Sequence, residues 1–319
     1  MKKLVLIAVA AAAALFSVAL YADEFPSRPI TIVAVFGPGS ASDTICRIIA
    51  DKLSPAIGQP VVVVDKPGVD GALAADYVHH QPADGYTLLM GTNSPLSADP
   101  FLHHVGYDPV KDFTPVTRVG SFTLMLVVNP NLPIHSVKEL VDYAKANPGK
   151  LTYASGNTAG IVGMETVKKW AEVSILHVPY KTTAPALEDI MAGRVSMMFA
   201  DFTSAMPHVA AGTIRPLAIS RIKRSKLYPD LPTLDEAGIK GFNLDAWAGL
   251  VAPTGTPPQI VTKLNAALRK VIDSPEVQVK FKNVGFEGFS SSPEELGDYI
   301  KAEIAEWGKM VKDAGIQPD

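Results

Sequence analysis

The chain has 319 residues, with 29 basic and 32 acidic side chains and a formal net charge of −3. This slight acidic excess lacks the basic footprint of a nucleic-acid-binding protein, so we expect no nucleic-acid partner. The single cysteine, Cys46, excludes an internal disulfide framework, and the isoleucines around it favour a buried small hydrophobic side chain. We therefore expect stability to come from packing.

Residues 1–22 have the features of a secretory signal peptide. Lys2 and Lys3 precede an apolar run over residues 4–20, and small residues follow it. A transmembrane anchor is the alternative, but the run is short of the roughly 20 apolar residues plus flanks that a stable span prefers, and an acidic pair starting at Asp23 follows at once. We expect cleavage before Asp23 and a free periplasmic protein, since no cysteine lies near the cleavage point to carry a lipid.

Strand-like and helical patterns alternate from residue 30 onward, which is typical of a parallel sheet with helices on its faces. In the first half we expect strands over 30–36, 61–65 and 87–91, with helices over 42–53 and 72–80. In the second half we expect strands over 122–128, 151–155, 175–180, 195–200 and 216–220.

The end of the chain is expected to be helical. Thr256-Pro257-Pro258 opens one helix, and Ser292 to Glu295 form a capping box with a proline at the first helical position of the last one. The mature chain of 297 residues (319 minus 22) is at the size where a single core stops growing, about 250 to 300 residues. We therefore expect two similar α/β lobes.

The first candidate site is the turn between the first strand and its helix. Small residues let a backbone approach a ligand closely, and the free amides at a helix start favour an anion. An ordinary strand-to-helix turn is the alternative. Asp43 lies in the first helical turn, where its carboxylate already interacts favourably with the helix dipole and would compete with a bound anion. Asp43 is therefore also a candidate partner for an ammonium or hydroxyl group of the ligand. The turn comprises Phe36, Gly37, Pro38, Gly39, Ser40, Ala41, Ser42 and Asp43.

The second candidate is the turn after the strand that ends near residue 155, where we expect Ser155 at the mouth of the site and open to water. Other polar strand ends join it, because ligands of open parallel sheets gather at the carboxyl ends of the strands. For each of these residues alone, local capping is the stronger alternative. The candidates are Ser155, Gly156, Asn157, Thr158, Ala159 and Gly160, with Thr92, Asn93, Tyr180, Lys181 and Asp201.

Enzyme signatures are missing. The sequence has no Gly-x-Ser-x-Gly elbow, no His-Glu-x-x-His, no phosphate loop and no cysteine pair. The His79-His80 and His103-His104 pairs suggest a metal, but adjacent residues of a helix point apart and a solvated surface is the alternative. We expect no catalytic residues, no metal and no cofactor, and we keep an exported hydrolase as a remote alternative.

Several segments resemble the Bug receptors, the substrate-binding proteins of tripartite tricarboxylate transporters. The opening Phe25-Pro26-Ser27-Arg28-Pro29-Ile30, the turn from Asp65 to Gly71 and the Ala83 to Leu89 segment match motifs of that family in order. Later matches cover nearly the whole mature chain: His177 to Lys181, Arg215 to Ser220, Pro229 to Thr233, and Glu236 to Gly238. Each motif is weak alone and specific in combination.

The resemblance implies a periplasmic binding protein of type II, with two α/β lobes, a ligand cleft between them and two crossover segments. Residues 23–122 with 248–319 would form one lobe and 123–247 the other. The crossings fall near Phe122 and near Trp247, which joins the candidate ligand contacts. The resemblance also implies a small carboxylate ligand, membrane permease subunits as partners and, in some members, a sensor role instead. We expect a monomer.

The sequence departs from the family pattern inside both turns. Val35 and Ser40 replace a proline and a glycine in the first turn, and Gly163 stands where the family often has histidine. Thr182 occupies the usual glycine position after Lys181. These changes leave both turns suited to an anion, and we do not infer citrate from the family name.

Overall fold

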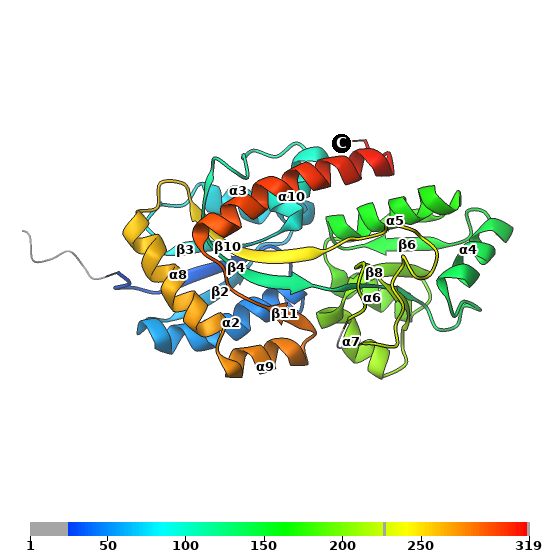
Figure 1. Cartoon of the computed structure of the whole chain (residues 1–319), viewed down its shortest axis with the longest axis horizontal. Coiled ribbons are helices and arrows are strands. Elements are labelled where there is room, and N and C mark those ends of the chain that lie inside the picture. Colours follow the sequence, from blue (N-terminus) through cyan, green and yellow to red (C-terminus); the bar gives the residue numbers. More distant parts are fainter. Residues whose placement is uncertain (1–24, 226–227, 318–319) are drawn as a thin grey trace, which may run out of the picture.

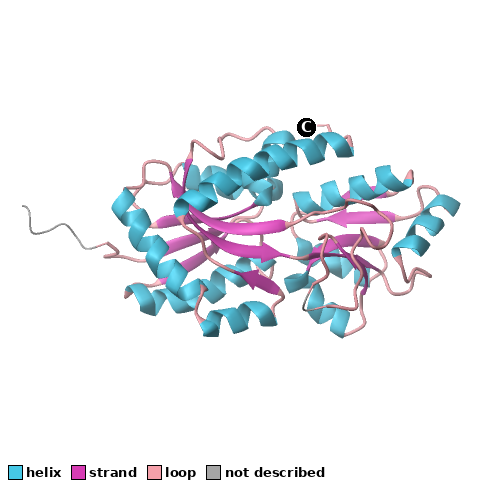
Figure 2. Cartoon of the chain, viewed as in Figure 1, coloured by secondary structure: helices cyan, strands magenta, loops and turns pink. Residues whose placement is uncertain are grey.

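The computed structural model describes residues 25–225 and 228–317, so the expected signal peptide lies outside the described residues. Two α/β bodies lie side by side, each built on one sheet (Figure 1). Helices cover both sheets, as the colouring by secondary structure shows (Figure 2). This two-lobed architecture confirms the predicted fold class.

The first sheet has six strands in the order β11-β4-β10-β3-β1-β2. Strand β1 pairs in parallel with β2 and β3, whereas β10 runs antiparallel to β3 and β4, and β11 runs antiparallel to β4. The sheet is therefore mixed, and the expected parallel sheet is wrong here, because β4 leaves toward the second lobe and β10 returns from it. The strands are β1 (Ile30–Ala34), β2 (Val61–Asp65), β3 (Thr87–Thr92), β4 (Phe113–Phe122), β10 (Ala246–Pro253) and β11 (Phe286–Gly288).

Five helices cover the first sheet on its two faces. Apolar residues at helical spacing, such as Ile45, Ile49 and Leu53 of α2, are fully buried against the sheet, and Cys46 is buried among them as expected. Helices α2, α8 and α9 share one buried cluster, while α3 and α10 share another on the opposite face. The helices are α2 (Ala41–Ile57), α3 (Ala72–His79), α8 (Pro258–Ile272), α9 (Pro275–Asn283) and α10 (Pro293–Ala314), with short turns η1 (Val69–Gly71), η2 (Ser94–Ala98) and η3 (Asp99–Phe101).

The second sheet has five strands in the order β7-β6-β8-β5-β9, with β5 antiparallel to β8 and β9. Helices α4 and α5 bury their apolar sides in one cluster, and α6 and α7 bury theirs in another. The elements are β5 (Leu124–Val128), β6 (Thr152–Ser155), β7 (Leu176–Pro179), β8 (Met197–Asp201), β9 (Arg215–Ile219), α4 (Val137–Ala146), α5 (Thr158–Ala171), α6 (Thr183–Met191) and α7 (Phe202–Ala210).

Three segments connect the lobes. The chain passes from β4 to β5 at Thr123 and returns through the stretch between β9 and β10. The last helix, α10, packs on β4 and η2 and reaches α5 of the second lobe, as its path along the top of Figure 1 shows. There Lys169 Nζ donates a hydrogen bond of 2.5 Å to the carbonyl oxygen of Asp313.

The ends of α10 follow from its sequence. Ser292 Oγ accepts from the amide of Glu295, whose carboxylate accepts from the amide of Ser292, which confirms the predicted capping box. Gly315 ends the helix with φ of 79°, a left-handed conformation that glycine adopts without steric cost.

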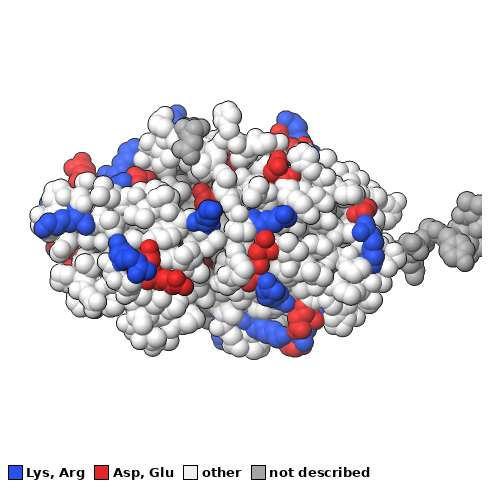
Figure 3. Space-filling model, turned by 180° about the vertical axis from the view of Figure 1, so that it is seen from behind, with Lys and Arg blue, Asp and Glu red and all other residues white. Residues whose placement is uncertain are grey.

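The surface carries both signs of charge in close proximity. On the face opposite to that of Figure 1, basic side chains lie next to acidic ones, and neither sign covers an extended area (Figure 3). Within residues 25–225 and 228–317, no helix combines the length and the apolar character that crossing a bilayer demands.

Candidate ligand-binding site

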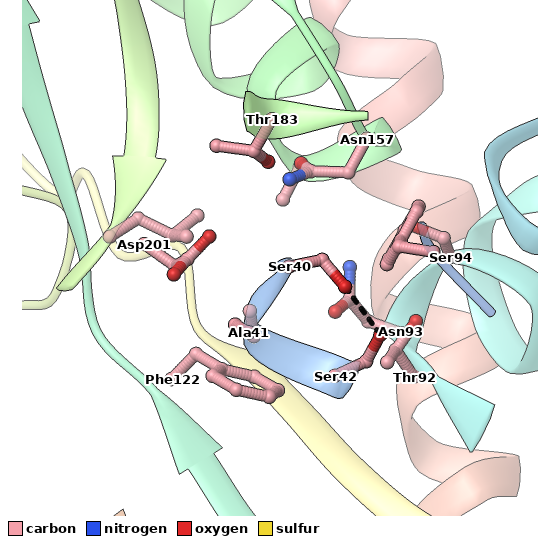
Figure 4. A pocket seen from close by; sticks show the side chains of 14 residues that line it. Ser40, Ala41, Ser42, Thr92, Asn93, Ser94, Phe122, Asn157, Thr183 and Asp201 are labelled. Carbon is pink, nitrogen blue, oxygen red and sulfur yellow. Dashed lines mark hydrogen bonds between the residues drawn. The ribbon is translucent and has the colours of Figure 1, made fainter. Parts of the chain in front are cut away.

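A cavity lies between the lobes, where strand ends of both sheets and the starts of four helices meet (Figure 4). Its volume is about 30 Å³, because the lobes approach each other closely around it. The first lobe contributes Phe36, Ser40, Ala41, Ser42, Thr92, Asn93 and Ser94; the second contributes Asn157, Ala159, Thr183 and Asp201; and the strand ends beside the crossings contribute Phe122 of β4, Leu124 of β5 and Ala246 of β10.

The helix starts at this cavity belong to α2, α5, α6 and α7. The N-cap residues of three of them, Ser40, Asn157 and Asp201, each accept a hydrogen bond from the amide three residues further on. Thr182, which precedes α6, makes no such side-chain bond. Each helix start carries a partial positive charge, so four of them direct a favourable field for an anion into one small space.

Neutral polar groups complete the lining. Thr92 Oγ1 and Asn93 Nδ2 are buried and have no hydrogen-bond partner among the described residues. Ser40 Oγ and Ser42 Oγ lie 3.2 Å apart and share a hydrogen bond. A buried donor without a partner is costly, so these groups favour a ligand that accepts hydrogen bonds.

Asp201 is the one ionisable side chain among the described residues that line the cavity. It ends β8, and its Oδ1 accepts a hydrogen bond of 2.8 Å from the amide of Ser204. The residue is 5% exposed, and this burial raises the pKa of its carboxyl group.

The first predicted turn contributes only part of its residues to the cavity. Phe36 and the three residues Ser40 to Ser42 line it, whereas Gly37, Pro38, Gly39 and Asp43 do not. Gly37 instead lies against the second lobe, since a Cβ atom placed on it would come within 3.3 Å of Thr182 Cγ2. The turn thus supplies groups that face the cavity and a contact between the lobes.

Asp43 is engaged elsewhere. Its Oδ2 accepts from the amide of Gly39 at 2.9 Å, and its Oδ1 lies 2.6 Å from Arg47 Nε. Arg47 also approaches Asp65 at 3.3 Å. These contacts hold the Asp43 carboxylate within its own lobe, so the structure does not bring it to the cavity.

The second predicted turn likewise divides. Asn157 and Ala159 line the cavity, whereas Gly156, Thr158 and Gly160 do not. Gly156 allows a close approach to α6, since a Cβ atom on it would lie 2.5 Å from the backbone at Thr182 and Thr183.

Ser155 is 2% exposed, so the expectation that it is open to water is wrong. Its Oγ lies 2.6 Å from His177 Nε2, and the His177 ring stacks on Tyr153 on the same face of the sheet. A serine beside a histidine is one element of a hydrolytic site. Here the serine is enclosed and outside the cavity.

Three further predicted contacts lie away from the cavity. The Tyr180 hydroxyl donates a short hydrogen bond to Asp189, and Lys181 is exposed to solvent. Trp247 is fully buried, and its ring packs edge-on against Tyr299 at 5.4 Å between centroids. Trp247 is therefore the second residue of β10 and packs inside the first lobe, while its neighbour Ala246 lines the cavity.

Five lining residues were not among the predicted contacts. Ser94 follows the predicted residue Asn93, and Thr183 lies two residues after Lys181. The other three lie beside the crossings: Phe122, Leu124 and Ala246. Proximity to a polar strand end was the available signal for Ser94 and Thr183. The apolar three carry no local signal, because only the meeting of the two sheets brings them to the cavity.

The histidine pairs do not assemble a metal centre in the part of the chain that the structure describes, where no group of three or more potential metal ligands occurs. The rings of His79 and His80 lie 4.7 Å apart, and His103 Nε2 lies 3.3 Å from Asp70.

Comparisons of the sequence and of the structure with known proteins find related receptors. The model of the tripartite tricarboxylate transporter family receptor matches residues 45–316. BugT of Bordetella pertussis is 32% identical over 301 residues, which cover 93% of this chain and 92% of BugT. The solved structure of R. palustris Rpa4515 with adipate is 38% identical, with a TM-score of 0.90 over 93% of this chain and all of that one. MatC from Rhodopseudomonas palustris with bound malate is 30% identical, with a TM-score of 0.84 over 90% of this chain and all of that one.

These matches confirm the resemblance to the Bug receptors. The family model spans most of the described residues of both lobes, and the Rpa4515 structure covers 93% of the chain. The chain belongs to the tripartite tricarboxylate transporter receptor family.

Proposed function

We propose that this chain is a periplasmic receptor that captures a small carboxylate, of the organic-acid or amino-acid type, and delivers it to the permease subunits of a tripartite tricarboxylate-type transporter. The observation that carries the proposal is the cavity, in which four helix starts and neutral donors converge without a basic side chain among the described lining residues. The relatives Rpa4515 and MatC, solved with adipate and malate, support it.

Neutral recognition suits a receptor that must also release its ligand. Backbone amides and hydroxyl groups can hold a carboxylate through several charge-assisted hydrogen bonds. Thr92 Oγ1 and Asn93 Nδ2 on the first lobe, and the start of α6 on the second, are the groups that we assign to this task. A ligand that contacts both lobes favours their closed arrangement.

We also propose the molecular setting of this activity. The mature protein begins near Asp23 after removal of residues 1–22 and acts in the periplasm as a monomer. Residues 23–122 and 248–319 form one lobe and 123–247 the other. Intact mass of periplasmic material tests the cleavage, and light scattering of the purified protein tests the oligomeric state.

Thermal unfolding of the mature protein with a panel of carboxylates, followed by calorimetric titration, tests the function. A ligand at 100 times its dissociation constant raises the free energy of unfolding by about 2.7 kcal/mol. Neutral and cationic analogues of the same size serve as controls. Absence of stabilisation by every aliphatic, aromatic and amino-acid carboxylate in the panel would refute the proposal.

A matched pair of variants locates the binding site. Thr92→Val keeps the shape of the side chain and removes a donor in the cavity, so we expect a loss of about 1.5 to 3 kcal/mol of binding free energy, or at least tenfold in affinity. Thr262→Val is the control, because Thr262 is exposed and bonds to Pro258 within α8. Equal affinities of the two variants would place the carboxylate elsewhere.

A further inference from the structure

The carboxylate of Asp201 is unusual in a cavity that otherwise suits an anion. It ends β8, and the labelled side chain points toward Asn157 and Thr183 around the cavity (Figure 4). It is 5% exposed, and one of its oxygens is occupied by the amide of Ser204. The start of α7 offsets part of its charge.

No basic side chain of the described residues compensates Asp201. The groups that influence its ionisation are the surrounding burial and the hydrogen bonds of its own helix start. Asp43, the buried carboxylate of the first predicted turn, differs: its Oδ1 lies 2.6 Å from Arg47 Nε. The protein therefore supplies a cation to the Asp43 carboxylate and leaves the Asp201 carboxylate at the cavity without one.

A plain diacid fits this arrangement poorly. Its two negative charges and that of Asp201 would share one small cavity, and like charges in a poorly solvated space repel strongly. An ammonium group, or more weakly a hydroxyl group, placed against Asp201 turns this repulsion into a hydrogen bond. The ligands of the two relatives differ in this respect, since malate carries a hydroxyl group and adipate carries none.

We infer that Asp201 selects carboxylates that also carry a proton donor, with amino acids preferred over hydroxy acids and both preferred over unsubstituted diacids. The inference rests on the proposed carboxylate-binding function. It assigns to a residue of the opposite lobe the role for which the sequence offered Asp43 as a candidate.

Two matched ligand series test the inference: succinate, L-malate and L-aspartate with four carbons, and adipate with L-2-aminoadipate with six. Calorimetric titration of the unsubstituted protein at pH 7.5 is expected to give an affinity for the amino member at least tenfold above that for the plain diacid of the series that fits. Malate is expected to fall between succinate and aspartate.

Asp201→Asn retains an oxygen to accept from Ser204 and removes the charge, so the preference for the amino member is expected to fall at least tenfold. Asp142→Asn is the control, because it makes the same change of net charge on α4, where Asp142 pairs with Lys138 away from the cavity. That variant is expected to keep the preference of the parent.

Two results would overturn the inference and leave the proposed function intact. One is tighter binding of the plain diacid than of its amino and hydroxy analogues by the parent protein. The other is an unchanged preference in Asp201→Asn. Failure of the parent to bind any member of either series, or any carboxylate of the wider panel, would overturn the proposed function and the inference with it.

Discussion

Thr158 Oγ1 donates a hydrogen bond of 2.9 Å to Asp99 Oδ1, and the two residues belong to different lobes. Asp99 begins η3 beside the first sheet, and Thr158 begins α5 beside the second. Both are fully buried, and Asp99 Oδ2 has no partner among the described residues. This hydrogen bond joins the two lobes in the buried part of their contact, so it must break when they separate.

Removal of this bond is expected to weaken the joined arrangement. Thr158→Val keeps the volume of the side chain and leaves Asp99 without its partner, so we expect a loss of about 1 to 3 kcal/mol in the free energy of unfolding. Urea denaturation measures it. The control is Thr166→Val on the same helix, whose hydroxyl bonds to Val162 within α5. A loss no larger than that of the control would show that the bond contributes nothing across the lobes.

Asp99 also predicts a dependence of stability on pH. Burial, and then repulsion from Asp70, raises the pKa of Asp99 well above its ordinary value of 3.8, although the bond from Thr158 acts in the opposite direction. A pKa that is higher in the folded state stabilises the protein fully below the unfolded value, and this stabilisation is lost as pH rises through the folded value.

Asp99→Asn removes that loss. We expect the free energy of unfolding of the variant to improve relative to the parent as pH rises from about 4 toward 8, because the amide stays neutral. Denaturation of both proteins over this pH range measures the difference in their free energies of unfolding. Titrating groups that both proteins share cancel in that difference. A constant difference between the two curves would contradict a raised pKa at Asp99.

Gly156 sets the spacing between the two turns of the second lobe. In Gly156→Ala the new Cβ atom would lie 2.5 Å from the backbone at Thr182 and Thr183, so the start of α6 must move. We expect at least a tenfold loss of carboxylate affinity and a destabilisation of about 1 to 3 kcal/mol. Titration and thermal unfolding measure the two effects.

The comparison variant for this prediction is Gly160→Ala. A Cβ atom there has its nearest neighbour at 3.6 Å, and the residue lies inside α5, where alanine is favoured over glycine. Its stability is expected to stay equal or to rise. If Gly156→Ala behaves like Gly160→Ala, the close approach of the two turns is not required.

The contact between Gly37 and Thr182 predicts compensation between the lobes. Gly37→Val adds methyl groups where a Cβ atom alone comes within 3.3 Å of Thr182 Cγ2, so we expect the closed arrangement and the affinity to be weakened at least tenfold. Adding Thr182→Gly clears the space and is expected to restore most of the affinity. Titration of the two single variants and the double variant measures this coupling, and strict additivity would contradict it.

The elements that follow local rules could be predicted from the sequence. The spacing of Ile45, Ile49 and Leu53 predicts the buried side of α2, and the pattern from Ser292 to Glu295 predicts the start of α10. The mixed character of the first sheet could not, because the pairing of β10 with β3 and β4 joins residues more than a hundred positions apart.

The candidate site shows the same division. Both strand-to-helix turns contribute some residues to the cavity, but the direction of each side chain depends on strand register. Ser155 shares the face of Tyr153 because side chains two residues apart on a strand point the same way, and it therefore meets His177 instead of the cavity. Asn157, past the end of the strand, is free to line it.

The path of α10 has a mechanical consequence. Two lobes joined only at the two crossings could open about any axis near them, but the bond between Lys169 and Asp313 adds a third attachment at the far end of α10. If this attachment is kept, the lobes can only turn about a line that runs from the strand crossings to the end of α10. The edge of the cleft far from that line then makes the longest excursion, so we expect a solute to enter there.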